Sequence, residues 1–237
     1  MLRILTEEHN RLPLLMKLPE AMLNLYREGE SLEQAPLAQA MEWADLILVG
    51  PGIGTGNTAG ELVAYLLSNS RLPVVLDADA LNLIAREPAL LQQASCPTVI
   101  TPHLGEMARL TGKSIAELKE DLPAAALDFA KRFHTICVLK DARTVVASPE
   151  GRVYINTSGC SALATAGSGD VLAGILASLL VQQNHAPHPQ PADRTAAAAV
   201  FLHGLLGELA ASQRNEASVL AGDLIQTLTF DPLFRGQ

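Results

Sequence analysis

The sequence predicts an α/β protein in which helices cover both faces of a mostly parallel sheet. Short apolar segments of strand length alternate with segments of helical periodicity along the 237 residues, a pattern typical of parallel strands joined by helices. Hydrophobic residues make up 49% of the chain and charged residues 18%, which suits a sheet buried on both faces. No stretch has the composition of an interdomain linker, so residues 1–237 are expected to form a single domain.

The predicted elements follow from this alternation. The expected strands are 2–5, 46–50, 73–79, 98–103, 136–140, 144–148 and 152–156. The expected helices are 13–28, 57–69, 79–95, 104–111, 114–132, 170–182, 193–212 and 217–229. The turn "PEG" between the last two strands predicts an antiparallel hairpin at one edge of the sheet. In such sheets ligands bind beyond the carboxyl ends of the strands, so the residues that close each strand are the candidates for chemistry.

Charge and cysteine content exclude several classes of partner. The net charge is -8 and no cluster of Lys or Arg occurs, so we expect neither a nucleic-acid surface nor contact with an anionic membrane. The three cysteines are widely spaced and have no metal-ligand pattern, which favours reduced thiols in the cytoplasm. We see no signal peptide and no apolar run of membrane-spanning length, so a soluble cytoplasmic protein is expected.

The segment "ATAGSGDVLAGILASLL" places small residues and one carboxylate before an apolar helical run. Gly167, Ser168 and Gly169 allow several backbone N–H groups and the positive end of the helix dipole to face one small volume, which favours an anion. Asp170 stands inside this turn. The alternative is that Asp170 only caps the helix, since aspartate is a favoured N-cap residue.

Two further strand ends carry glycines and carboxylates. The turn "GPGIGTG" follows a strand but lacks the spacing of the dinucleotide-binding fingerprint, so it is either a close approach to a ligand or a tight strand-to-helix turn. In "LDAD", Asp77 and Asp79 would point to the same side if the strand reached Asp79, which would make a carboxylate pair for Mg²⁺. Asp79 is equally well suited to cap the next helix.

A histidine and a lysine complete the predicted edge. His103 in "TPHLGE" follows a strand, and we weigh ligand contact against a structural role. Lys140 ends an apolar strand, where a cation needs an anion nearby or an exit to water. A glycine turn at a helix start, a carboxylate, a lysine and a carboxylate pair are parts of a phosphoryl-transfer site. No P-loop pattern is present, so the architecture must be a different one.

Five segments in order resemble one known family. "VGPGIGTG", "LDADALNLIA", "VITPHLGEMARL", "VLKDARTVVASPEGRVYIN" and "SALATAGSGDVLAGILASLL" are similar to the ADP-dependent NAD(P)H-hydrate dehydratases of the ribokinase-like superfamily. The resemblance covers about residues 2 to 229 and implies a three-layer αβα sandwich. It also implies that ADP phosphorylates the S form of NADH or NADPH hydrate, with Mg²⁺ assisting, and that loss of phosphate restores the reduced nicotinamide.

The resemblance also implies roles for particular residues. Asp170 would contact the hydrate and act as the base for its hydroxyl, while Gly54 and His103 would contact the hydrate. Asp79 is placed at the site without a role, and the metal ligands are unknown. The residues implied in nucleotide binding are Lys140, Asp141, Ala142, Arg143, Thr144, Gly167, Ser168 and Gly169.

The chain departs from the family pattern at three places. Asp141 stands where the family usually has glycine, and Cys160 stands where it usually has asparagine. Family domains also begin with a strand, a glycine turn and a helix that precede the counterpart of "LRIL", so the chain is expected to lack this N-terminal strand-helix unit and to have an uncovered sheet edge.

Two other functions stay open at this point. One is a ribokinase-like small-molecule kinase, which would use the same Asp170 and anion-binding turn. The other is a non-catalytic nucleotide-binding module left by the missing unit. A homo-oligomer, such as a tetramer, is expected, and small apolar helices such as 193–212 are either part of the core or part of an interface.

Overall fold

The computed structural model describes residues 1–27, 29 and 34–230, and its centre is a six-stranded sheet. The strands lie in the order β3 (Ile47–Val49), β4 (Val74–Leu76), β5 (Thr98–Ile100), β6 (Ile136–Leu139), β7 (Val145–Ala147) and β8 (Val153–Ile155). β3 to β6 are parallel, and β7 and β8 form the predicted antiparallel hairpin at one edge. The mostly parallel α/β fold is therefore confirmed.

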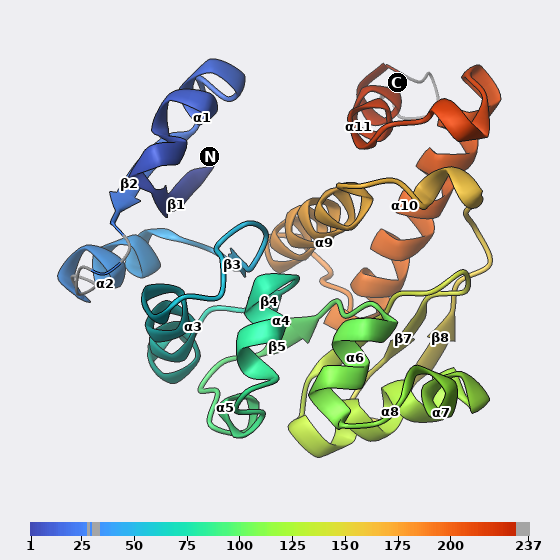
Figure 1. Cartoon of the computed structure of the whole chain (residues 1–237), viewed down its shortest axis with the longest axis horizontal. Coiled ribbons are helices and arrows are strands. Elements are labelled where there is room, and N and C mark those ends of the chain that lie inside the picture. The colour runs from blue at the N-terminus through green and yellow to red at the C-terminus, as the bar shows by residue number, and fades with distance from the viewer. Residues whose placement is uncertain (28, 30–33, 231–237) are drawn as a thin grey trace.

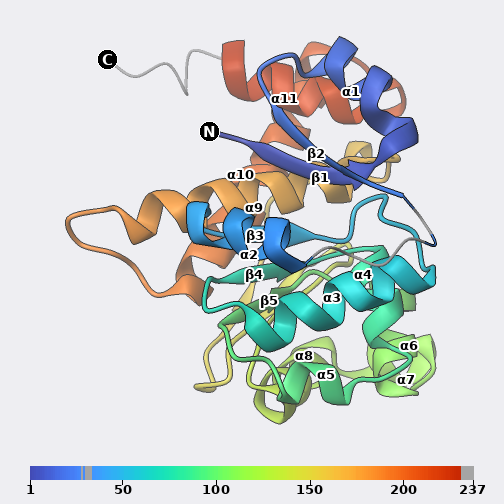
Figure 2. The same ribbon diagram turned by 90° about the vertical axis from the view of Figure 1, so that its left-hand side faces the viewer.

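Helices cover both faces of this sheet, which makes three layers (Figures 1 and 2). One face carries α3 (Asn57–Asn69), α4 (Asp79–Ile84), α5 (Ala89–Gln92), α6 (Leu104–Thr111), α7 (Ile115–Glu120) and α8 (Leu122–Phe133). The other carries α9 (Ser168–Asn184), α10 (Ala192–Gln213) and α11 (Ala221–Phe230). Successive residues of β4 alternate between the two cores, as strand geometry requires: Val74 and Leu76 face the first group, and Val75 faces the second.

Helix α10 corrects one expectation from the sequence. By length and apolar composition, Ala192–Gln213 is long enough to span a membrane, although we expected no such run. Half of its most apolar window is buried, and it packs against α9, α11 and the sheet. A core helix of a globular domain has the same length and composition.

Residues 1–27 form a separate unit rather than part of the main sheet. β1 (Arg3–Glu7) and β2 (Met22–Tyr26) make a two-stranded parallel sheet joined by η1 (Glu8–Asn10) and α1 (Arg11–Lys17), and Figure 1 shows this unit apart from the six strands. The prediction that "LRIL" joins the main sheet and that 13–28 is one helix is wrong. Proline cannot continue a helix, and Pro19 follows the end of α1, after which the chain turns and becomes extended.

Other boundaries differ for similar local reasons. The predicted helix 79–95 is divided into α4 and α5 before Pro88, and the predicted helix 114–132 is divided into α7 and α8. Asp121 accepts a hydrogen bond from Ala124 N and so caps α8. Helix α2 (Gln34–Trp43) was not predicted, and the region 217–229 contains η3 (Glu216–Ser218) before α11. A short η2 (Ser161–Leu163) lies before α9.

Candidate active site

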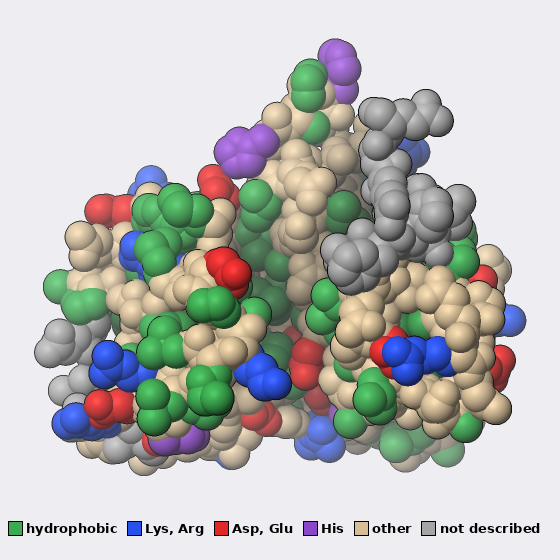
Figure 3. Space-filling view, turned by 90° about the horizontal axis from the view of Figure 1, so that it is seen from above, with side chains coloured by type: hydrophobic (Ala, Val, Ile, Leu, Met, Phe, Trp, Pro, Cys, Tyr) green, Lys and Arg blue, Asp and Glu red, His purple; other side chains and the backbone are tan. Residues whose placement is uncertain are grey.

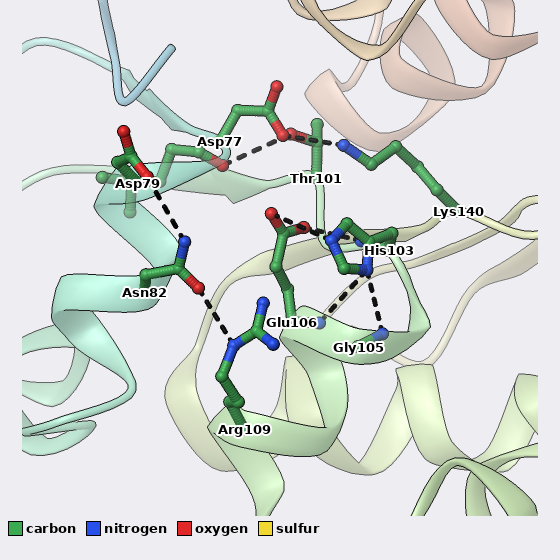
Figure 4. Close-up of polar contacts among 10 residues, drawn as sticks. Asp77, Asp79, Asn82, Thr101, His103, Gly105, Glu106, Arg109 and Lys140 are labelled. Atoms are coloured by element: carbon green, nitrogen blue, oxygen red, sulfur yellow. Dashed lines mark hydrogen bonds and ion pairs between the residues drawn. The ribbon is translucent and has the colours of Figure 1, made fainter. Parts of the chain in front are cut away.

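The carboxyl ends of three neighbouring strands and the start of α9 meet at one edge of the sheet. Asp77 directly follows β4, β5 leads through Thr101 to His103, and Lys140 directly follows β6. Lys140 N donates to Pro102 O at 2.7 Å, which ties the end of β6 to the segment before His103. Figure 4 shows that Asp77 and Lys140 point toward one another above the Glu106 and His103 pair.

A buried ion pair stands at the centre of this edge. Lys140 Nζ lies 2.8 Å from Asp77 Oδ1, and the two side chains are 20% and 2% exposed. A Cβ atom added at Gly169 would lie 3.3 Å from Lys140 Nζ, so the lysine also borders the first turn of α9. Lys140 thus finds the anion that a cation at the end of an apolar strand requires. Its charge faces both the buried carboxylate and the helix start.

The first turn of α9 is open toward this lysine. Gly167 is the N-cap residue and has a φ of 84°, a conformation that glycine adopts without strain. The N–H groups of Gly169 and Asp170 have no acceptor among the residues that the structure describes. Unpaired amides at a helix start carry the positive end of the helix dipole. The predicted anion-binding geometry is therefore present.

Asp170 is not the cap of α9, because Gly167 occupies that position. The Asp170 side chain is exposed and accepts no hydrogen bond from the described part of the chain. Partial burial raises the pKa of Asp170, the charge of Asp77 raises it further, and the charge of Lys140 lowers it. A carboxylate without a partner and with a raised pKa is a suitable general base.

The predicted pairing of Asp77 with Asp79 is wrong. β4 ends at Leu76, and Ala78 has a φ of 49°, which a residue with a side chain rarely adopts. The chain therefore turns, and Asp79 Oδ2 accepts from Gly54 N at 3.0 Å while Asp77 contacts Lys140. Asp79 also accepts from Asn82 (Figure 4). It is the first residue of α4 and does not cap that helix.

Gly54 belongs to a turn that the end of β4 holds in place. Gly50, at the start of this turn, has a φ of 132°, and a Cβ atom there would lie 1.7 Å from Asp77 O. Gly50 therefore permits a close backbone approach between the two strand ends. Gly54 is exposed and has a φ of 74°. The structure places this turn beside Asp79, and contact of Gly54 with a substrate stays a prediction.

His103 has the structural role that we weighed, and its ring also borders the site. It is the N-cap of α6, where Nδ1 accepts from Gly105 N at 2.9 Å and from Glu106 N at 3.3 Å. Because Nδ1 accepts, the proton of the neutral ring is on Nε2. The side chain is 54% exposed, so contact with a ligand stays open to it.

Glu106 was not predicted as a site residue. Its Oε2 accepts from His103 N at 2.8 Å, which completes a capping box, and its side chain is 6% exposed. Burial raises the pKa of Glu106, and Asp77 raises it too, whereas the hydrogen bond from His103 and the charge of Lys140 lower it. The capping-box spacing was visible in the sequence, but its closeness to Lys140 was not.

The predicted nucleotide segment forms the turn between β6 and β7. Residues 141–143 are exposed, and Thr144 Oγ1 donates to Asp141 O at 3.3 Å. Arg143 donates to Thr157 O at 3.3 Å, so this turn adjoins the segment that leads into α9. Cys160 caps η2 without a side-chain hydrogen bond. The structure brings the turn and the start of α9 to the same edge.

Neither a cluster of metal ligands among the described residues nor the cavity described next marks this site. Among residues 1–27, 29 and 34–230, no group of three or more His, Cys, Asp or Glu could hold a metal ion. A cavity of about 310 Å³ lies elsewhere, and no predicted site residue lines it. Its lining residues are Leu91, Gln92, Ala94, Cys96, Thr98, Arg132, Phe133 and His134.

Fold and site together define a class of protein. A three-layer sheet with an open helix start, a lysine and an unpaired aspartate at its carboxyl edge is a ribokinase-like α/β protein with an anion-binding turn. Residues 1–229 match the NAD(P)H-hydrate dehydratase family model. The chain belongs to that family, as the sequence motifs predicted.

Known relatives are consistent with this assignment. The chain is 42% identical over 195 residues to a bifunctional NAD(P)H-hydrate repair enzyme of Moorella thermoacetica, an alignment covering 82% of this chain and 36% of that protein. It is 40% identical over 181 residues to the ADP-dependent (S)-NAD(P)H-hydrate dehydratase of Neisseria meningitidis serogroup B, covering 75% of this chain and 59% of that protein. The chain thus spans between about one third and three fifths of these relatives.

A solved structure gives the same fold. The ADP/ATP-dependent NAD(P)H-hydrate dehydratase from Bacillus subtilis, crystallised with ATP and Mg²⁺ and soaked with CoA, superposes with a TM-score of 0.76 at 28% identity. The superposition covers 96% of this chain and 78% of the other. The likeness therefore extends over nearly all of the present chain.

Proposed function

We propose that this chain catalyses the ADP-dependent dehydration of the S form of NADH hydrate or NADPH hydrate. The β-phosphoryl group of ADP is transferred to the hydroxyl oxygen of the hydrated ring, and AMP leaves. The C–O bond then breaks, so phosphate departs with that oxygen, and a proton lost from the neighbouring ring carbon restores the double bond. The products are AMP, inorganic phosphate, a proton and NADH or NADPH.

The environment of the Asp170 carboxylate is the observation that supports this proposal most strongly. Its carboxylate has no hydrogen-bond partner among the described residues and has a raised pKa, caused first by partial burial. It stands in the first turn of α9 beside the N–H groups of Gly169 and Asp170 that lack acceptors. The carboxylate would accept the proton of the hydrate hydroxyl, while these amides and Lys140 would receive the negative charge of the transferred group.

The nucleotide would bind between the β6–β7 turn and the start of α9. Residues 141–143 are exposed there, and Thr144 N-terminal to β7 lies beside them. Asp141 adds a negative charge to this turn, which favours contact with the ribose hydroxyls over contact with the phosphates. Helix dipole and lysine both favour the phosphates near Gly167 to Gly169.

The hydrate would bind on the other side of the Asp77–Lys140 pair. The exposed Gly54 turn and the half-exposed ring of His103 border this side. Nε2–H of His103 is a donor that lies 3.5 Å from Glu106 Oε1, so an oxygen of the nicotinamide nucleotide would compete with Glu106 for it. Arg109, which donates to Asn82 at 3.0 Å, adds a cation on the same side as His103 (Figure 4).

Mg²⁺ would enter with the phosphates of the nucleotide. Mg²⁺ commonly keeps several water ligands and needs only one or two carboxylates when phosphates are present. Asp77 is paired with Lys140 and Asp79 accepts from Gly54 and Asn82, and the described residues hold no cluster of three ligands. The ion would supply charge neutralisation of the phosphates, and we assign it no dedicated protein ligands.

The experiment that tests this function follows recovery of the reduced nicotinamide absorbance. The purified 237-residue chain is mixed with NADH hydrate, ADP and Mg²⁺, and parallel reactions omit ADP or replace NADH hydrate with NADPH hydrate. We expect recovery only when ADP is present, with AMP and inorganic phosphate formed in equal amounts. ADP consumption without recovery of absorbance, together with a stable phosphate ester, would instead identify a small-molecule kinase.

Binding without turnover is the third outcome. If ADP raises the thermal midpoint but no product forms with either hydrate, the chain is a nucleotide-binding module under these conditions. Loss of ADP binding in the Lys140→Ala variant would then support a nucleotide site at the β6–β7 turn, which Lys140 precedes. No stabilisation by ADP would contradict both readings.

A further inference from the structure

The segment that leads into α9 lies along one face of α10. Ser158 Oγ donates to Phe201 O at 2.9 Å, and Gly159 N donates to Glu208 Oε1 at 2.6 Å. At the end of this segment, Ser168 Oγ lies 3.1 Å from His203 Nε2. The contacts with α10 therefore run from the start of the segment to the first residue of α9.

Two glycines of α10 allow the segment to approach closely. A Cβ atom at Gly204 would lie 2.1 Å from Ser158 Oγ and 2.8 Å from the Ser158 carbonyl carbon. A Cβ atom at Gly207 would lie 2.7 Å from two atoms of Leu163. Glycine weakens a helix interior, so helix propensity does not explain these two residues. Close packing against residues 158–163 does.

His203 is the polar member of this face. Its side chain is in the interior, with the residue 7% exposed, and Ser168 is 5% exposed. Burial lowers the pKa of His203 to about 4, a hydrogen bond with the Ser168 backbone opposes this, and the charge of Lys140 lowers the pKa further. The ring is therefore neutral near pH 7, and it has one N–H donor and one acceptor. Its hydrogen-bond partner among the described residues is Ser168.

An apolar side chain such as leucine could occupy position 203 without the cost of burying a polar ring. A buried imidazole is worth its desolvation only where it makes a hydrogen bond, and the bond here is to the first residue of the turn that holds Gly169 and Asp170. Misplacement of a reacting group by about 1 Å can lower a rate by roughly a hundredfold. The position of Ser168 is thus the property that His203 can control.

We propose that His203 is a positioning residue, which acts through Ser168 to fix the first turn of α9 for phosphate, while Gly204 and Gly207 hold the preceding segment against α10. The proposal rests on the proposed function for its catalytic consequence. The positioning itself does not depend on which reaction the chain catalyses.

The first test compares three single variants in the hydrate assay. His203→Leu should lower kcat/KM for ADP by about ten- to a hundredfold, and His203→Gln, which can still bond to Ser168, should recover most of the loss. Leu206→Ala is the matched control, because Leu206 is a fully buried neighbour on the same helix. We expect this control to lower the thermal midpoint at least as much as His203→Leu but to keep kcat/KM within about twofold of the wild-type value.

Two outcomes of this comparison would overturn the proposal. One is a His203→Leu variant with wild-type kcat/KM, and the other is a Leu206→Ala variant that loses as much kcat/KM as His203→Leu. A merely structural histidine would produce one of these two results, since loss of stability alone does not change the rate constants of the molecules that remain folded.

A second test addresses the glycines. Gly204→Ala must displace the Ser158 backbone, so we expect a loss of ADP affinity of at least tenfold. Gly174→Ala is the control, because Gly174 is a helical glycine of α9 with nothing within 4 Å of an added Cβ atom. Equal ADP affinity in the two variants would contradict the role of the α10 face.

A third test does not depend on activity. Hydrogen exchange of the backbone amides of residues 167–171 should be faster in His203→Leu than in wild type and close to wild type in His203→Gln. If the wild-type chain shows no turnover, the proposed function fails, but faster exchange in this peptide would still support the positioning role. Unchanged exchange in His203→Leu would overturn it.

Discussion

The N-terminal unit, residues 1–27, and the site edge of the six-stranded sheet each contain an ion pair between residues distant in the sequence, and the two pairs differ in burial. Arg27 and Glu8 in the unit are 63% and 45% exposed, whereas Lys140 and Asp77 are 20% and 2% exposed. Water screens the first pair, and the second lies where charges interact strongly and are costly to separate. Of the two pairs, only Lys140 and Asp77 are buried enough to hold charged groups of a reaction site in fixed positions.

The apolar side chains differ in the same direction. None of the described residues before Leu37 is buried, and eight of the fifteen exposed large apolar side chains of the described residues lie in the N-terminal unit. Figure 3 shows hydrophobic side chains gathered on the left-hand part, where Figure 1 places this unit. The site edge instead rests on two continuous cores. We therefore expect substitutions in the two regions to have different consequences.

The largest expected effect is on turnover at the site edge. Asp170→Asn removes the proposed base and should lower turnover by about 10²–10⁴-fold, measured by recovery of reduced nicotinamide absorbance. Asp128→Asn is the control, because Asp128 is an exposed carboxylate on α8 that no site residue contacts. An Asp170→Asn variant within threefold of the wild-type rate would exclude the aspartate as the base.

Removal of the two ion pairs should have different effects on the free energy of unfolding. Lys140→Met leaves the buried Asp77 carboxylate without its partner and should lower the free energy of unfolding by about 3–5 kcal/mol. Glu8→Gln removes the exposed pair and should leave the urea midpoint unchanged within error. Urea unfolding of the two variants and of wild type measures this difference. Equal midpoints for the two variants would show that the buried pair contributes no more to stability than the exposed one.

Leucine truncation gives the next contrast. Leu176 is fully buried in α9, and Leu176→Ala should cost about 2–5 kcal/mol through lost contacts and a cavity. Leu12 in α1 is 70% exposed, and Leu12→Ala should cost less than about 0.5 kcal/mol. Chemical denaturation followed by circular dichroism measures both. A large loss from Leu12→Ala would mean that α1 is covered in solution.

The smallest expected effect concerns the pH dependence of stability. The pKa of Asp170 is raised in the folded chain, chiefly by burial, so the folded state binds this proton more tightly than the unfolded state. The stability from this group is therefore fully present below its unfolded pKa and is lost as pH rises through its folded pKa. Asp170→Asn should consequently have a thermal midpoint at pH 7 that is equal to or above that of wild type. A lower midpoint would mean that the ionised carboxylate has a stabilising partner.

Sequence periodicity predicted the region from residue 57 onward better than the region before it. α3 and α6 begin and end where their apolar spacing and flanking glycine or histidine indicated. The errors at 13–28 and 79–95 arise at Pro19 and Pro88, where apolar periodicity continued across a residue that interrupts helices. The error at 114–132 arises at Asp121, which caps α8. These helix-ending residues were visible in the sequence, but the apolar periodicity around them was given more weight.

The site was predicted residue by residue but not as a set of contacts. Lys140 needed an anion, and the structure supplies Asp77, which is 63 positions earlier in the chain. No local pattern identifies that pair, because it depends on two strands lying two places apart in the sheet. The Asp77 and Asp79 spacing was misleading for the opposite reason: the backbone at Ala78 leaves the strand conformation that the prediction assumed.

Gly50 places a main-chain contact, rather than a side-chain contact, between the glycine turn and Asp77, the residue that follows β4. The distance between the glycine turn and Asp77 is therefore set by backbone-to-backbone packing. Exchanges of the surrounding side chains can alter which molecule is accepted and leave this spacing unchanged. A change at Gly50 would instead move both parts of the site at once, so variation in ligand preference is expected at the exposed rim and not at this glycine.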